Sequence, residues 1–298
     1  MTSNSLVREI NIVKHYLRLT GLTLSFVLLA GCSENGVSAG DNGEEPPAWE
    51  LDNYNLVWHN EFSGQYLDLD KWSYEVNGEG GGNNELQYYT DRPENSYLDS
   101  GKLHIVARQE TYTGDDGTRY FTSARLRTKG KGDWLYGRFD IRAKLPQGQG
   151  LWPAIWMLPT DWQYGGWAAS GEIDIMELLG HEPDRVYGTL HYGGEYPQNE
   201  HSGDSYTVSQ GAFADSFHVF RMDWDTTSIK WYVDNELYQT QTHWYSTSAA
   251  YPAPFDKRFH LLLNVAVGGN WPGDPDSTTQ FPQEMVVDYV RVYQPVNE

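Results

Sequence analysis

The sequence predicts an all-β fold, because apolar residues alternate, turn-forming residues recur at short intervals and a helical period is missing. Between 136 and 145, Phe139, Ile141, Ala143 and Leu145 alternate with charged residues, as in a half-buried strand. Clusters of Gly, Asn, Asp and Pro separate such segments, and beyond the N-terminal region no 11-residue stretch has a convincing helical period. Many strands with frequent turns are typical of an antiparallel sandwich or barrel.

The first element along the chain is a predicted targeting segment over residues 1–31. Three basic residues precede an apolar run at 19–31, which is short for a membrane span of about 20 residues. The run ends in Leu29-Ala30-Gly31-Cys32, which resembles the lipobox of bacterial lipoproteins, and Cys32 is the single cysteine of the chain. We therefore expect a lipoprotein-type signal peptide and lipidation of Cys32. The alternative is an ordinary signal peptide with an incidental cysteine.

Residues 32–50 are rich in small, polar, acidic and proline residues, so we expect a flexible tether there. The remaining residues, 51–298, are expected to form one folded domain without an internal repeat, acting as a monomer. A lipid on Cys32 would anchor this domain to a membrane. That predicts a location in the bacterial cell envelope, facing outside the cytoplasm, or secretion if the lipid is absent.

Composition narrows the classes of partner. The formal net charge of −20 at pH 7 argues against nucleic acid, whose binding needs a basic surface. It also disfavours a highly sulfated polymer, although a local basic patch could overrule the net charge. Aromatic residues make up 14% of the chain, with 12 Trp and 21 Tyr, which suits either a β-sheet core or stacking on sugar rings. A single cysteine excludes an intramolecular disulfide.

Five further segments are predicted strands. They cover residues 103–108, 217–224, 229–233, 259–267 and 285–293. In the second of these, His218, Phe220, Met222 and Trp224 share one face. The fourth is almost continuously apolar, which fits a strand in the centre of a sheet.

The most informative segment is Gly171-Glu-Ile-Asp-Ile-Met-Glu177. Alternation puts Glu172 and Asp174 on one face of a strand, with apolar residues behind them. Glu177 would point to the opposite face, because its offset from Glu172 is odd. One extra residue in a β-bulge would restore it to the same face, and bulges often lie beside active sites. We therefore expect a bulge at residue 175 or 176.

Three carboxylates on one strand face repel each other, so either structure or function must explain why they are there. The structural explanation is a row of exposed acidic residues or a calcium site. The catalytic interpretation is a retaining glycosidase, whose nucleophile and proton donor lie roughly 5–5.5 Å apart. Positions i and i+4 of a straight strand are about 13 Å apart at Cα, so a concave sheet and converging side chains would have to close the gap. Like charges this close raise one pKa, which keeps a proton on the acid catalyst.

Aromatic residues surround this motif in the sequence. Trp152 and Trp156 are four residues apart and therefore share a strand face, and Trp167 precedes Glu172 by five residues. His191 lies on the next expected strand, beside the acids. For His191, contact with the substrate or the nucleophile competes with the role of an ordinary buried histidine.

The segment from Glu172 to Glu177 closely resembles glycoside hydrolase family 16, and its Glu-x-Asp-x-x-Glu spacing resembles the branch that includes laminarinases. Seven other segments resemble bacterial laminarinases, in the family's order, between residues 55 and 294. They begin at Trp58, Asn83, Thr122, Tyr136, Gly188, Asn264 and Val287.

The resemblance implies a β-jelly-roll sandwich with a concave substrate cleft. It implies Glu172 as nucleophile, Glu177 as acid/base and Asp174 as helper, with no cofactor for catalysis. The sugar contacts that it implies are Asn84, Arg125, Trp152, Trp156, Trp167 and His191. It also implies a structural Ca²⁺ on the convex side, with ligands from Glu61, the backbone of Gly101 and Asp288. Gly80-Gly81-Gly82 departs from the family, where relatives often have a Trp, and leaves the subsite pattern open.

Together these features predict an endo-acting, retaining hydrolase of β-1,3-glucan. Mixed-linkage β-1,3-1,4-glucan and agar-type galactans are alternative substrates, and transglycosylation would use the same residues. A non-catalytic glucan-binding surface protein is the alternative of another class. Proteins of that kind lack the catalytic glutamates, whereas all three acids are present here.

Overall fold

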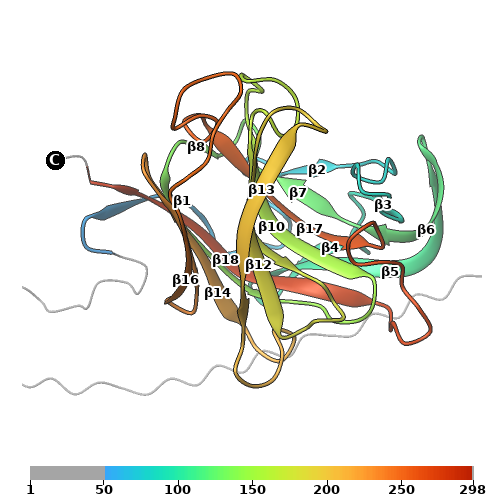
Figure 1. Ribbon diagram of the computed structural model, residues 1–298. Helices are drawn as coiled ribbons and strands as arrows, with labels where there is room; N and C mark the ends of the chain where they lie inside the picture. The colour runs from blue at the N-terminus through green and yellow to red at the C-terminus, as the bar shows by residue number, and fades with distance from the viewer. Residues whose placement is uncertain (1–50, 297–298) are drawn as a thin grey trace, which may run out of the picture. The chain divides into compact units, whose positions relative to one another are not determined.

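The computed structural model describes residues 51–296, which form two β-sheets and contain no helix (Figure 1). The ten-stranded sheet comprises β1 (Tyr54–Asn60), β3 (Gln87–Tyr89), β4 (Ser96–Asp99), β5 (Lys102–Gly114), β6 (Gly117–Ser123), β9 (Gly137–Lys144), β14 (His218–Trp224), β15 (Ile229–Val233), β16 (Glu236–Gln241) and β18 (Gln283–Pro295). The eight-stranded sheet comprises β2 (Ser73–Glu75), β7 (Arg125–Arg127), β8 (Asp133–Trp134), β10 (Leu151–Pro159), β11 (Glu172–Leu178), β12 (Arg185–Gly193), β13 (Asn199–Thr207) and β17 (Phe259–Val267).

The predicted signal peptide 1–31, the lipidation site Cys32 and the tether 32–50 lie outside the described residues. These three expectations therefore stay predictions. Within residues 51–296, no helix has the length and apolar character needed to cross a membrane.

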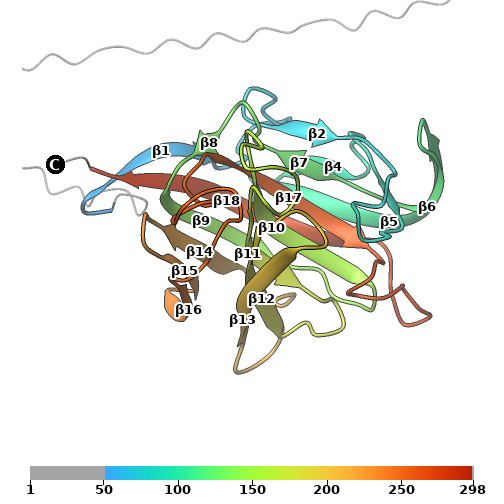
Figure 2. The ribbon, with the colours of Figure 1, turned by 45° about the horizontal axis from the view of Figure 1, so that its top comes forward.

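The predicted antiparallel sandwich is confirmed. The strand order is β16-β15-β14-β9-β18-β5-β6-β3 in one sheet and β13-β12-β11-β10-β17-β7-β2 in the other, with β1, β4 and β8 paired beside these paths. Every strand pair is antiparallel except β3 with β6. Successive strands such as β9 and β10, or β17 and β18, belong to different sheets, so the chain passes repeatedly between the two layers (Figure 2).

All six predicted strands are present. β15 and β17 have the predicted bounds, and the alternation in β9 and β14 buries the expected side chains except His218, which is half-buried at the start of β14. β5 is longer than predicted and continues to Gly114, because its second half pairs with β6 in a hairpin. The polar alternation of residues 109–114 gave no apolar face from which to predict that extension.

The core lies between the two sheets. Ile141 and Phe220 from one sheet and Ile155 and Leu263 from the other are each at most 1% exposed. Burial of one such side chain stabilises the fold by about 1.5–3 kcal/mol. Every residue of β17 is buried, which confirms it as the predicted central strand between β10 and β7. The face of the eight-stranded sheet that points away from the core contains the candidate active site.

Candidate active site

A bulge in β11 sets the direction of the three acids. Against β10, Met176 pairs with Ile155 and Asp174 pairs with Trp156, which leaves Ile175 as the extra residue. The register with β12 also shifts between Asp174 and Glu177. The predicted bulge is therefore confirmed at Ile175.

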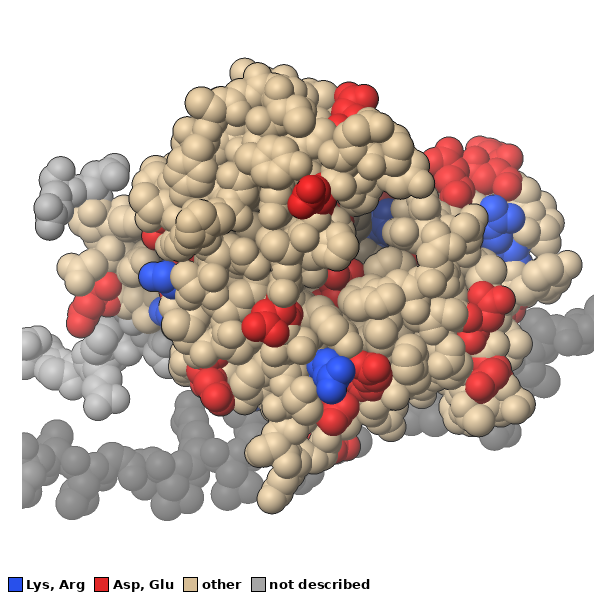
Figure 3. All heavy atoms as spheres, viewed as in Figure 1, with Lys and Arg blue, Asp and Glu red and all other residues tan. Residues whose placement is uncertain are grey.

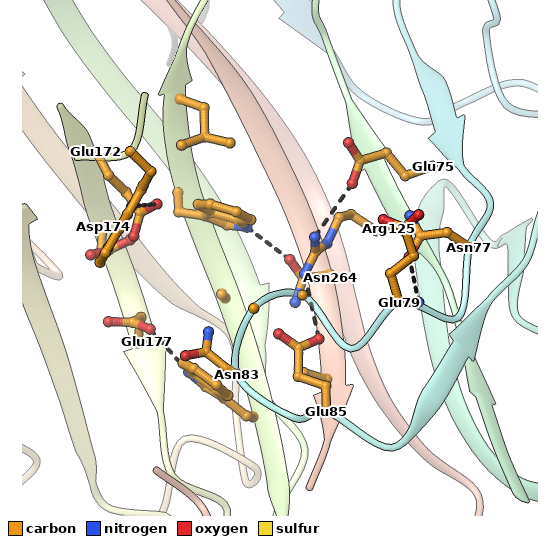
Figure 4. A pocket seen from close by; sticks show the side chains of 18 of the residues that line it. Glu75, Asn77, Glu79, Asn83, Glu85, Arg125, Glu172, Asp174, Glu177 and Asn264 are labelled. Carbon is orange, nitrogen blue, oxygen red and sulfur yellow. Dashed lines mark hydrogen bonds and ion pairs between the residues drawn. The ribbon is translucent and has the colours of Figure 1, made fainter. Parts of the chain in front are cut away.

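The bulge turns two successive apolar side chains into the core. Ile175 and Met176 are both at most 2% exposed and both belong to the core cluster. Glu177 consequently returns to the face that carries Glu172 and Asp174, and all three line one cavity. Figure 4 shows these acids together on one side of the cavity, across from Arg125.

Two neighbouring cavities form an extended cleft over the eight-stranded sheet. The first has a volume of about 570 Å³ and the second about 620 Å³. Both are lined by Asn83, Trp152, Trp167, Glu172 and Glu177, so the acids lie where the cavities meet. The face of the molecule seen in Figure 3 is hollowed, with acidic side chains in and around the hollow.

β10 supplies the floor of the first cavity. Trp152, Ala154, Trp156 and Leu158 all line it, which confirms that the two predicted tryptophans share a strand face. The indole N–H of Trp156 donates to Asn264 Oδ1 on β17 at 2.7 Å. The apolar ring faces of these tryptophans suit the C–H faces of sugar rings.

Each of the two glutamates accepts one indole hydrogen bond. Trp167 Nε1 donates to Glu172 Oε2 at 2.8 Å, and Trp152 Nε1 donates to Glu177 Oε1 at 3.0 Å. His191 Nε2 lies 3.7 Å from Glu172 Oε1 and 3.3 Å from Asp174 Oδ2. The predicted tryptophan and histidine neighbours therefore fix the orientation of the acids themselves, in addition to lining the cleft.

Burial shifts the ionisation of this cluster. Burial and the adjacent Asp174 carboxylate raise the pKa of Glu172 to about 8, against the opposing effects of His191 and Trp167. Burial also raises the pKa of Asp174 to about 8. Burial and the other two carboxylates raise the pKa of Glu177 well above its ordinary 4.5. The cluster thus retains protons near neutral pH, as a group that donates a proton must.

Arg125 lines the cleft, but most of its contacts are with other residues of the protein. Its guanidinium lies 3.4 Å from Glu75 Oε2 and 3.5 Å from Glu85 Oε2, and it donates to the Tyr89 hydroxyl at 3.2 Å. It also stacks over the rings of Tyr89 and Trp156, 4.5 and 5.3 Å from their centroids. Its side chain is only 12% exposed.

Asn84 is not among the residues that line either cavity, whereas its neighbour Asn83 lines both. The side-chain amide of Asn84 donates to Asn270 Oδ1 at 2.8 Å, and its backbone has a φ of 58°. The left-handed backbone turns this side chain toward the 270 loop, so a sugar contact at Asn84 stays a prediction that the geometry does not favour.

Several cleft residues were missing from the sequence prediction. Asn83, Glu75, Glu85 and Asn264 line the first cavity, and Tyr187, His201 and Trp271 line the second. Trp271 packs edge-on against both Trp152 and Tyr187, with centroids 5.6 and 5.1 Å apart. Its position beside Pro272 in a glycine-rich loop was the one available signal, since exposed aromatic residues on loops often bind ligands.

Comparison with known proteins identifies the family that shares this arrangement. The family model for glycosyl hydrolases family 16 matches residues 74–291. The chain belongs to glycosyl hydrolase family 16. Family 16 enzymes hydrolyse glycosidic bonds, so this chain is a glycoside hydrolase.

Two relatives illustrate the similarity. The chain is 46% identical over 256 residues to glucan endo-1,3-beta-glucosidase A1 of Niallia circulans, covering 80% of this chain but only 38% of that protein. It is 44% identical to the beta-glucanase of Rhodothermus marinus, covering 94% of this chain and 96% of the relative.

Solved family 16 structures have the same fold. The laminarinase of Rhodothermus marinus superposes with a TM-score of 0.74 at 44% identity, covering 82% of this chain and 98% of that one. The laminarinase catalytic domain of Thermotoga maritima gives the same TM-score at 42% identity, covering 83% and 100%. The predicted jelly-roll sandwich is therefore confirmed.

The predicted calcium ligands lie away from the cleft, on and beside β18. Glu61 accepts two hydrogen bonds from Arg291, at 2.9 and 2.7 Å, and Asp288 pairs with Arg142. A cation there would compete with both guanidinium groups. Within residues 51–296, the one group of three close candidate ligands from His, Cys, Asp and Glu is Glu172, Asp174 and His191, so the calcium site stays a prediction.

Proposed function

We propose that this family 16 chain is an endo-acting, retaining hydrolase of laminarin-type β-1,3-glucan. The main supporting observation is that the bulge at Ile175 brings Glu172 and Glu177 to one face, at the junction of two cavities. Relatives named glucan endo-1,3-beta-glucosidase and laminarinase support the choice of glucan.

In the first chemical step, a Glu172 carboxylate oxygen attacks the anomeric carbon while Glu177 gives its proton to the departing glycosidic oxygen. Trp167 stabilises the ionised form of Glu172 through its indole N–H. The raised pKa of Glu177 keeps the required proton on the acid.

In the second step, Glu177 removes a proton from water, and the resulting hydroxide displaces Glu172 from the sugar. Two inversions give net retention. Asp174 lies next to both glutamates and its charge raises both of their pKa values. It therefore couples the proton on one glutamate to the charge on the other.

Endo action is supported by the position of the acids within the cleft. Trp156 and Arg125 line the cavity on one side of them, and Tyr187 and Trp271 line the cavity on the other. Sugar units can therefore bind on both sides of the bond that breaks, as cleavage within a chain requires.

Product analysis tests this function. Purified protein is incubated with laminarin, lichenan and agarose, and products are followed by mass spectrometry and by NMR at early times. We expect fastest cleavage of laminarin, mixed oligosaccharide lengths and initial release of the β-anomer. Initial α-anomer would contradict retention, and faster cleavage of lichenan or agarose would reassign the substrate.

A variant separates catalysis from glucan binding alone. Glu172→Ala is expected to abolish laminarin hydrolysis while the melting temperature stays close to wild type. Glu200→Ala, on the exposed face of β13, is the matched control and should retain activity. Wild-type protein that binds laminarin without cleaving it would support the non-catalytic surface protein instead, the activity suggested by a relative named beta-1,3-glucan-binding protein.

We also propose that Cys32 carries a lipid that holds the domain at the cell envelope. Support comes from the basic and apolar segments of residues 1–31 and from Leu29-Ala30-Gly31-Cys32. Expression in a bacterium with a clickable fatty acid should label the wild type but not Cys32→Ala. Equal labelling of both proteins would reject lipidation at Cys32.

A structural calcium ion is the third proposal, with Glu61, the Gly101 carbonyl and Asp288 as ligands. Oxygen donors suit this hard cation, and Asp288 lies where the register of β18 with β9 shifts. Because binding to the folded state alone stabilises it, calcium should raise the melting temperature of EGTA-treated wild type but not of Asp288→Asn. No shift in the wild type would reject the site.

A further inference from the structure

A second groove runs from the outer face of the ten-stranded sheet to the loops that contain Gly148, Gly180 and Asp276, and it shares no lining residue with the catalytic cleft. It consists of two cavities of about 410 and 450 Å³, which meet at Gln147 and Gln283. Leu103, Ile105 and Ala107 of β5 face the core. The intervening residues of that strand therefore face outward, toward this groove.

The groove contains two cations whose side chains form no ion pair. Within residues 51–296, Arg108 is the one arginine whose side chain makes neither a hydrogen bond nor an ion pair, and it interacts with Glu110 only at longer range. Lys144 has no carboxylate within ion-pair distance. This is unexpected in a chain of net charge −20, where carboxylates are abundant. Two cations without an ion pair in one concave site can bind an anionic ligand.

The one carboxylate in the first of the two cavities is already engaged. Glu284 Oε2 lies 3.0 Å from His104 Nδ1 and accepts a hydrogen bond from the Tyr97 hydroxyl at 3.5 Å. The Tyr97 ring stacks on His104 with centroids 4.6 Å apart and planes at 6°. Tyr97 is nevertheless 40% exposed, so its ring is held rigidly and remains accessible to a ligand.

The spacing of the cations favours a polymer over a small anion. Arg108 is on β5 and Lys144 on β9, with β18 between these strands. Neighbouring strands lie about 4.8 Å apart, so the two strands are separated by about 10 Å. Val286 of β18 pairs with His104 on one side and with Lys144 on the other, so Arg108 also lies four residues, about 13 Å, along the sheet from Lys144. The two Cα atoms are therefore about 16 Å apart, which suits charges on different sugar units of one chain better than a single carboxylate or sulfate.

We propose that this groove is a second carbohydrate-binding site, specific for acidic polysaccharide. Arg108 and Lys144 pair with carboxylate or sulfate groups, Tyr97 stacks against a sugar ring, and Gln147 and Gln283 bind hydroxyl groups. The site would hold the domain on a charged matrix while its cleft processes a neutral glucan. It stands independently of the glucan specificity proposed above.

Calorimetry with two acidic probes tests the site. The Glu172→Gln protein, which we expect to be unable to hydrolyse glucan, is first saturated with laminaritetraose to occupy the cleft. It is then titrated at low salt with oligoguluronate, which carries carboxylates, or with a sulfated galactan oligosaccharide. Neutral laminarihexaose is the uncharged comparison. Binding of one acidic probe identifies the preferred group, and binding of both defines a general anionic site.

The deciding comparison uses two variants with the same loss of charge. Arg108→Gln/Lys144→Gln removes the two groove cations, and Lys129→Gln/Lys230→Gln removes two cations outside the groove. We expect ~10-fold or greater loss of affinity in the first and less than ~2-fold in the second, because only the first removes charge-assisted contacts to the probe. Tyr97→Ala should also weaken binding.

Laminarin hydrolysis by the Arg108→Gln/Lys144→Gln variant, with Glu172 intact, should equal wild type and so show that it folds. Equal affinity in the two charge variants would overturn the site in favour of non-specific attraction. Absence of binding by either acidic probe up to ~10 mM, a binding free energy weaker than about 3 kcal/mol, would also overturn it.

Discussion

The indole N–H of Trp167 donates to Glu172 at 2.8 Å, and the corresponding group of Trp152 donates to Glu177 at 3.0 Å. Each bond favours the ionised form of its acceptor. The nucleophile must be ionised and the acid must be protonated when the substrate binds. The bond to Glu172 therefore favours the protonation state that catalysis needs, whereas the bond to Glu177 opposes it. Removing the first bond should shift the acidic limb of the pH profile of kcat/KM, and removing the second should shift the alkaline limb.

Trp167→Phe keeps an aromatic ring but removes the hydrogen bond to Glu172. The pKa of Glu172 should rise further, so the acidic limb of kcat/KM should move to higher pH by roughly one unit, given about 1.4 kcal/mol per unit. Trp162→Phe is the control, because Trp162 lines the same cavity. An acidic limb that stays in place would show that Trp167 acts only by contact with sugar.

Trp152→Phe should change the opposite limb. Without the indole donor the pKa of Glu177 rises, so the proton remains on the acid to higher pH and the alkaline limb of kcat/KM moves upward. The maximal rate is expected to fall, because the carboxyl group loses one of its orienting contacts. A downward shift of the alkaline limb would contradict the assignment of Glu177 as the acid.

Burying three acids has a cost in stability that depends on pH. Glu177 has a folded-state pKa above its unfolded value, so between those values the folded state binds more protons and stability falls as pH rises. Glu177→Gln should therefore raise the free energy of unfolding by roughly 1–3 kcal/mol at pH 8. At pH 4, below both pKa values, the carboxyl group is mostly protonated in both states, so the difference should be close to zero.

Urea denaturation of wild type and Glu177→Gln at both pH values measures this effect, with exposed Glu200→Gln as the control. Stabilisation of equal size at pH 4 and pH 8 would attribute the gain to packing. Destabilisation at pH 8 would show that Glu177 is ionised and favourably paired in the folded protein.

Features set by neighbouring residues could be predicted from the sequence, whereas contacts between residues far apart in the chain could not. Alternation and apolar runs are local properties, so the strands at 137–144 and 259–267 and the bulge beside Glu177 could be predicted from neighbouring residues. The Arg125 cluster could not, because Glu75 and Glu85 lie 50 and 40 positions earlier and only the pairing of β2 with β7 and the loop before β3 bring them together. No spacing rule connects such distant charges.

The bulge itself can be tested by changing its length. Deleting Ile175 leaves Glu-x-Asp-x-Glu, in which plain alternation keeps both glutamates on the cleft face. We expect lower stability from the lost core side chain but retained hydrolysis, within ~100-fold of wild type, a loss typical of a misplacement of about 1 Å. Inserting one alanine after Ile175 makes the offset six, so plain alternation keeps both glutamates on the cleft face but about 20 Å apart at Cα, too far to act on one glycosidic bond, and hydrolysis should be lost. Equal activity of the deletion and insertion variants would show that the spacing set by the bulge is not needed for catalysis.

Arg125 lines the cleft and belongs to a buried charge cluster. Its removal should therefore lower the free energy of unfolding more than it lowers the catalytic rate. Arg125→Met would leave Glu75 and Glu85 without their shared cation and should cost about 3–5 kcal/mol, as is typical for breaking a buried ion pair. Arg127→Met is the matched control, because Arg127 also pairs with Glu75 but its side chain is 35% exposed, and it should cost about 1 kcal/mol or less. Adding Glu85→Gln to Arg125→Met should recover part of the loss, since it removes the uncompensated charge. Equal costs for the two arginine variants in urea denaturation would show that Arg125 is held mainly for contact with sugar.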